Sequence, residues 1–134
     1  MPDFEILPHT ADLRIKVYGN SRAELFQNAL RGMFESIAPT WKAGAGVQHE
    51  IAVVSTDQNA LLIDFLSEAL SLSDINDEAY TDIEITEFTN TELRGTLIGK
   101  SITRFAIEIK AVTHHGIDIK KIGERWETEI VFDV

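Results

Sequence analysis

The sequence predicts an α+β domain in which two α-helices cover one face of a mainly antiparallel β-sheet. Two segments carry apolar residues at helical spacing, and several others alternate apolar with polar residues, as half-buried strands do. These segments follow the order strand, helix, strand, helix and then several strands. A chain of 134 residues is long enough to bury one core, and no linker-like stretch interrupts it. We therefore expect residues 1–134 to form a single domain.

Each predicted helix has a recognisable start. The segment Ser21-Arg22-Ala23-Glu24 has the spacing of a capping box, and apolar residues then recur at helical intervals as far as Pro39. Asp57 can cap a second helix whose apolar stripe begins at Leu61. Asp64 and Glu68 lie one turn apart on another face of this helix, where a solvated surface is a better interpretation than an acid and base pair. The two stripes and the last strand supply these predicted core residues: Leu25, Phe26, Leu30, Phe34, Leu62, Phe65, Leu66 and Phe132.

Strands are predicted where apolar residues appear at every second position. This pattern is clear in residues 13–17, 83–85, 105–110 and 126–134. In the last of these segments Phe132 and Asp133 fall on opposite faces. Polar residues on the second face favour antiparallel strands with one face in contact with water.

The composition excludes several classes of function. The chain has no cysteine, so thiolate metal sites, disulfides and cysteine nucleophiles are excluded, and any metal must bind oxygen or imidazole. Twelve basic against 22 acidic side chains give a net charge of −10, which disfavours tight direct binding to nucleic acid. No stretch is long and apolar enough for a membrane helix, and the first residues do not resemble a secretory signal, so we expect a cytoplasmic protein.

Two acids are the candidate metal ligands. Asp12 directly precedes a predicted strand, and Asp133 ends another strand beside Val134. Chain-end acids are usually solvated charges, and nothing in the spacing shows that these two meet. The pair His114-His115 lies at a strand end, where successive side chains diverge, so a histidine site is disfavoured.

Four blocks in order carry a resemblance to a known family. They are His9-Thr10-Ala11-Asp12, the segment 61–70 (LLIDFLSEAL), the segment 109–115 (IKAVTHH) and Phe132-Asp133-Val134. Their order and spacing resemble the archease signature, and the match runs from about residue 4 to the end of the sequence. Each block alone is weak, whereas four in register are specific.

The resemblance implies an accessory protein of the RtcB-type tRNA-splicing RNA ligase. That ligase joins RNA ends with GTP and manganese after its own histidine is guanylylated, and archease is understood to promote guanylylation and multiple turnover without being an enzyme itself. The family is expected to bind a divalent cation, often Ca²⁺, through residues that correspond to Asp12 and Asp133, with an oxygen of Val134. Lys110 matches a family lysine linked to activity, and we group His9 with it as an activity residue.

Other interpretations stay open at this stage. Carboxylate ligands also suit Mg²⁺ or Mn²⁺, so the metal is not fixed. A small metal-dependent phosphohydrolase would use Asp12 and Asp133 with His9 as the nearby base. A chaperone-like binding module would need a large exposed apolar patch. Without the resemblance, Lys110 is better interpreted as an exposed strand lysine.

Overall fold

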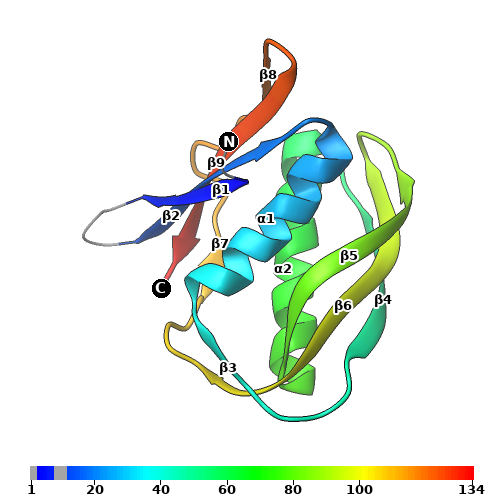
Figure 1. Cartoon of the computed structure of the whole chain (residues 1–134). Helices are drawn as coiled ribbons and strands as arrows, with labels where there is room; N and C mark the ends of the chain where they lie inside the picture. The colour runs from blue at the N-terminus through cyan, green and yellow to red at the C-terminus, as the bar shows by residue number, and fades with distance from the viewer. Residues whose placement is uncertain (1–2, 8–11) are drawn as a thin grey trace.

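Two antiparallel sheets and two helices make up the fold in the computed structural model, which describes residues 3–7 and 12–134 (Figure 1). The α+β class is therefore confirmed. The strands are divided between two sheets, however, whereas the sequence predicted one. Alternation of apolar residues shows which face of a strand is buried, but it does not show which strands pair.

The first sheet joins the beginning of the chain to its end. Its strands, in spatial order, are β1 (Phe4–Leu7), β2 (Leu13–Gly19), β9 (Arg125–Asp133) and β7 (Ala111–Val112), and β8 (Lys120–Ile122) also pairs with β9. All of these pairs are antiparallel. The β2–β9 register runs from Leu13 opposite Phe132 to Gly19 opposite Trp126.

The second sheet is organised around its longest strand, β6 (Glu92–Phe105). Three strands pair with β6 in antiparallel fashion: β3 (Pro39–Trp41), β4 (Val47–Val54) and β5 (Glu78–Phe88). At Gly99 on β6 an added Cβ would lie 2.0 Å from the carbonyl oxygen of Ala79, so this close approach of two strands requires glycine.

Both helices begin where the sequence predicts. In α1 (Arg22–Ser36), the Ser21 side chain accepts a hydrogen bond of 3.1 Å from the N–H of Glu24. In α2 (Gln58–Asn76), the Asp57 side chain accepts one of 2.8 Å from the N–H of Ala60. The second helix ends at Asp77, which adopts a left-handed conformation with φ of 53°. Among the described residues, no helix is long and apolar enough to cross a membrane.

The core lies where the helices meet the inner faces of the sheets. Helix α1 contacts β2 of the first sheet and β5 of the second, and α2 packs mainly on the second sheet. The rings of Phe26 and Phe65 join the two helices, with centroids 6.0 Å apart. All eight predicted core residues are at most 2% exposed, so this prediction is confirmed.

The predicted strand over residues 105–110 is wrong. Strand β6 ends at Phe105, and the chain then turns toward the end of α1, where the N–H groups of Ala106 and Ile107 donate to the Ile37 carbonyl at 2.9 and 3.4 Å. The alternation in the sequence has another origin: Ile109 packs against the core while Glu108 and Lys110 are exposed. A tethered loop that packs one side on the protein interior produces the same period of two as a strand.

We expect Phe65→Ala to lower the free energy of unfolding by about 3–5 kcal/mol, because it removes a fully buried ring between the two helices. Urea titration followed by circular dichroism measures this loss. Ile75→Ala is the matched control on the same helix, since Ile75 is 76% exposed and its truncation should change stability by less than about 0.5 kcal/mol. Equal effects of the two substitutions would contradict this assignment of the core.

Candidate functional site

The pairing of β2 with β9 brings the two candidate acids to one end of the first sheet. The last pair at this end is Leu13 opposite Phe132, so Asp12 lies directly before it on one strand and Asp133 directly after it on the other. Leu13 and Phe132 are both buried. Because side chains alternate along a strand, the flanking acids lie on the opposite, outward face of the sheet. The structure thus supplies the proximity that spacing in the sequence could not show.

Asp12 is tied to its own strand by an arginine. The Nε of Arg14 donates to Asp12 Oδ1 at 3.3 Å, and its Nη1 donates to Glu129 Oε1 on β9 at 3.2 Å. These hydrogen bonds, first that to Asp12 and then that to Glu129, raise the pKa of Arg14 above its ordinary value. The guanidinium therefore remains charged and neutralises part of the negative charge at this end of the sheet.

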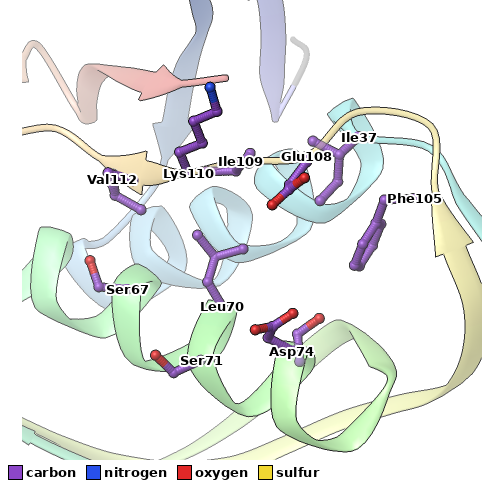
Figure 2. A pocket seen from close by; sticks show the side chains of 12 residues that line it. Ile37, Ser67, Leu70, Ser71, Asp74, Phe105, Glu108, Ile109, Lys110 and Val112 are labelled. Atoms are coloured by element: carbon purple, nitrogen blue, oxygen red, sulfur yellow. The ribbon is translucent and has the colours of Figure 1, made fainter.

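Lys110 lies beside Asp133. The backbone N–H of Lys110 donates to the backbone carbonyl of Asp133 at 2.7 Å. The next residue, Ala111, pairs with Asp133 where β7 lies beside β9. Figure 2 shows the Lys110 side chain extending from its loop toward the end of β9. Lys110 is exposed, but it lies in a loop that joins the sheets and not within a strand, so its interpretation as a strand lysine is wrong.

The other residues singled out in the sequence lie as follows. Val134 follows Asp133 and is 40% exposed. His9 lies outside the described residues. The pair His114-His115 follows β7 in the loop that leads to β8, as expected for residues that flank a turn.

The donors at this end match a hard cation in kind. Asp12 and Asp133 provide carboxylate oxygens, and the main chain at Asp133 and Val134 provides further oxygens. Oxygen ligands are those that Ca²⁺, Mg²⁺ and Mn²⁺ prefer. Over residues 3–7 and 12–134, no three His, Asp or Glu side chains are grouped closely enough to hold a metal by themselves. Main-chain oxygens and water would therefore have to complete any coordination shell here.

Comparison with known proteins gives the family. The model of the archease protein family matches residues 4–134, nearly the whole chain. The archease of Methanosarcina acetivorans is 31% identical over 139 residues, which cover 98% of this chain and 95% of that protein. The archease of Pyrococcus abyssi is 30% identical over 143 residues and the full length of both chains. The chain belongs to the archease family.

Solved structures agree with this assignment to the archease family. The solution structure of protein 1598 of Methanobacterium thermoautotrophicum has a TM-score of 0.76 and 29% identity, and the match covers 100% of both chains. The crystal structure of a Thermotoga maritima archease, described as a possible chaperone, has a TM-score of 0.67. At 24% identity, with 96% and 94% of the two chains covered, it supports the fold alone.

A second polar cluster in this archease-family chain was missed by sequence reasoning. The Nε2 of His49 on β4 lies 2.7 Å from Glu78 Oε1, and the Tyr80 hydroxyl donates to the same oxygen at 2.9 Å. Glu78 and Tyr80 are buried on β5, so the cluster connects the two strands that flank β6. No local sequence pattern indicates this cluster, because His49 and Glu78 are far apart in the sequence. The two contacts satisfy the buried carboxylate of Glu78.

Burial, followed by the hydrogen bond to Glu78, raises the pKa of Tyr80 well above its ordinary value. The folded protein therefore keeps a neutral phenol at a pH where the unfolded chain ionises it. The stabilisation is present below the unfolded pKa of about 10 and is lost progressively as the pH rises above that value.

We expect Tyr80→Phe to lower the free energy of unfolding by about 1 kcal/mol near neutral pH, because a buried hydrogen bond is lost. Above a pH of about 10 the difference in free energy of unfolding between the wild type and Tyr80→Phe should become smaller, since only the wild type loses stability as this phenol ionises. Urea titrations across this pH range give the comparison. Parallel stability curves for the two proteins would show that Tyr80 does not contribute to the pH dependence.

Proposed function

We propose that this protein is a non-enzymatic accessory factor that activates an RtcB-type RNA ligase in tRNA splicing or RNA repair. It would act by promoting guanylylation of the ligase and so sustaining multiple turnover. The observation that carries the proposal is the convergence of Asp12, Asp133 and Lys110 at one end of the first sheet. Three of the four sequence blocks of the family thereby meet at one surface of the molecule.

A divalent metal, with Ca²⁺ preferred and Mg²⁺ or Mn²⁺ as alternatives, is proposed to bind at this end of the sheet. Asp12 and Asp133 would hold it with a main-chain oxygen of Val134. Two carboxylates that share one location repel each other, and a bound cation offsets that repulsion. When bound, the metal supplies a positive charge that phosphate oxygens can approach on an otherwise acidic protein.

The residues themselves would position the partner. Lys110 is directed toward the end of β9 and provides a mobile cation beside the acids, suited to a phosphate or to an acidic side chain of the ligase. Arg14 is bonded to Asp12 and to Glu129, and it orients the Asp12 carboxylate on the outward face. The net charge of −10 favours a partner with a basic surface over free RNA.

The two alternative functions receive less support. A phosphohydrolase needs a general base beside the metal; its candidate base, His9, lies outside the described residues, and within them no three His, Asp or Glu side chains form a group that could hold a metal. A chaperone-like module needs a contiguous apolar surface. The large apolar side chains that are exposed in the described part of the chain are scattered over separate elements: Ile6, Trp41, Val54, Ile75, Ile107, Ile122 and Val134.

Asp12→Asn and Asp133→Asn should each weaken Ca²⁺ binding at least about tenfold, because each removes one negative charge from the ligand set. Isothermal titration calorimetry with CaCl₂, repeated with MnCl₂, measures the change. Glu129→Gln is the matched control, since Glu129 also bonds Arg14 but lies farther along β9 from the end of the sheet. If the wild type binds neither metal, or if the control weakens binding as much as the two Asp variants, the proposed metal site is wrong.

The activity of the cognate RtcB-type ligase tests the function directly. With labelled GTP, wild-type protein should accelerate ligase guanylylation, whereas alone it should neither label nor join RNA. Asp12→Asn, Asp133→Asn and Lys110→Ala should bring the rate to within about twofold of the ligase alone, a barrier difference below about 0.5 kcal/mol.

Glu68→Gln on the exposed face of α2 serves as the control variant and should retain full acceleration. Circular dichroism verifies that each variant is folded. Absence of acceleration by the wild type would refute the proposed function. Full activity of Lys110→Ala alone would remove only the role of the lysine.

A further inference from the structure

A cleft of about 710 Å³ lies between α2 and the loop that connects β6 to β7 (Figure 2). Its apolar floor includes Leu70 of α2 together with Phe105 and Ile109 from the other side. Asp74 of α2 and Glu108 of the loop stand at its rim, and Lys110 lies at one end. The function proposed above makes no use of this space.

Both walls of the cleft are fixed by backbone hydrogen bonds. At one end of the loop, the backbone N–H groups of Ala106 and Ile107 donate to the Ile37 carbonyl. At the other end, the backbone N–H of Lys110 donates to the backbone carbonyl of Asp133 at 2.7 Å. The opposite wall is a regular helix whose side chains at Ser67 and Ser71 are small. The loop therefore spans from one sheet to the other over α2 without filling the space beneath it, and the cleft is preformed.

The rim of the cleft carries negative charge that the protein does not neutralise. Figure 2 shows Glu108 on the loop and Asp74 on α2 at opposite sides of the cleft, with Leu70 beside them. Both residues are exposed, and within the described part of the chain neither side chain forms a hydrogen bond or an ion pair. The Lys110 side chain is directed away, toward β9. Nothing described in the protein thus serves as the counter-charge.

The position of Asp74 works against the helix that carries it. Asp74 lies in the last turn of α2, where the negative end of the helix dipole disfavours an acid and favours a cation. The helix has three acids, Asp64, Glu68 and Asp74, and no lysine or arginine. An acid at a locally unfavourable position, with a second acid at the opposite side of a cleft with an apolar floor, points to a cationic ligand from outside the chain.

We propose that this cleft receives an arginine- or lysine-bearing segment of the ligase. The aliphatic stem of the basic side chain lies on Leu70 and Ile109, and its cationic head is held between Asp74 and Glu108. This inference rests on the proposed function for the identity of the partner. The same loop ends at Lys110, so a segment seated in the cleft is continuous with a partner surface at Asp12 and Asp133.

Charge reversal at the rim tests the proposal. Asp74→Lys and Glu108→Lys should each weaken binding to the purified cognate ligase about tenfold or more, as measured by calorimetry at low salt. Glu68→Lys is the matched control: it makes the same charge change on the same helix outside this cleft, and it should alter the affinity less than about twofold. Asp74→Lys also replaces an acid that opposes the helix dipole, so a loss of binding is not explained by a loss of α2.

Methyl NMR of the full chain provides a second, local measurement. Addition of unlabelled ligase should shift the methyl signals of Leu70 and Ile109, while those of Val54 and Ile122, which are exposed elsewhere, should stay in place. If the wild type binds and activates the ligase but Asp74→Lys and Glu108→Lys behave like Glu68→Lys, the cleft is not a docking site and the proposed function stands. If the wild type neither binds nor activates the ligase, the proposed function and this inference both fail.

Discussion

The pairing of β2 with β9 is the constraint on which the rest of the molecule depends. It joins a strand near the start of the chain to the strand at its end, over a continuous register from Leu13 to Gly19. Its inner face presents Ile15, Val17 and Ile130 to α1, and all three are at most 1% exposed. Closing so long a loop is entropically costly, so buried apolar surface on this face must compensate. The same register aligns Asp12 with Asp133 on the outer face.

The second sheet extends the fold from this base. Strand β6 pairs with β3, β4 and β5, and the helices bury its inner face. Buried polar groups are satisfied locally in both sheets: in the second, Glu78 is bonded to His49 and Tyr80, and beside the first, the side chain of Asn28 on α1 donates to the Tyr18 carbonyl on β2 at 2.7 Å. The chain can therefore bury polar residues at the junction of helices and strands without leaving these groups unpaired.

The loop at residues 106–110 links the two sheets and borders both proposed functional surfaces. Because it is anchored at Ile37 and at Asp133, it places Glu108 over the cleft and Lys110 beside the acids that we propose as metal ligands. Under the two proposals, this short segment would supply the Glu108 carboxylate to a basic side chain of the partner. It would also supply the Lys110 ammonium group to the end of the first sheet that carries Asp12 and Asp133. A loop held at both ends can present such groups with little ordering cost on binding.

Local features of the sequence determined the helices, the buried faces and most of the core. Ser21 and Asp57 cap their helices as predicted, and Phe26, Phe65 and Phe132 are buried, because capping and side-chain periodicity are properties of a few neighbouring residues. The resemblance in four blocks nominated Asp12, Asp133 and Lys110. Only the tertiary structure decided that these residues meet, that the strands form two sheets, and that residues 106–110 form a tethered loop above a cleft. Strand pairing and loop routes depend on which distant surfaces bury each other, and the period of a sequence carries no information about that partner.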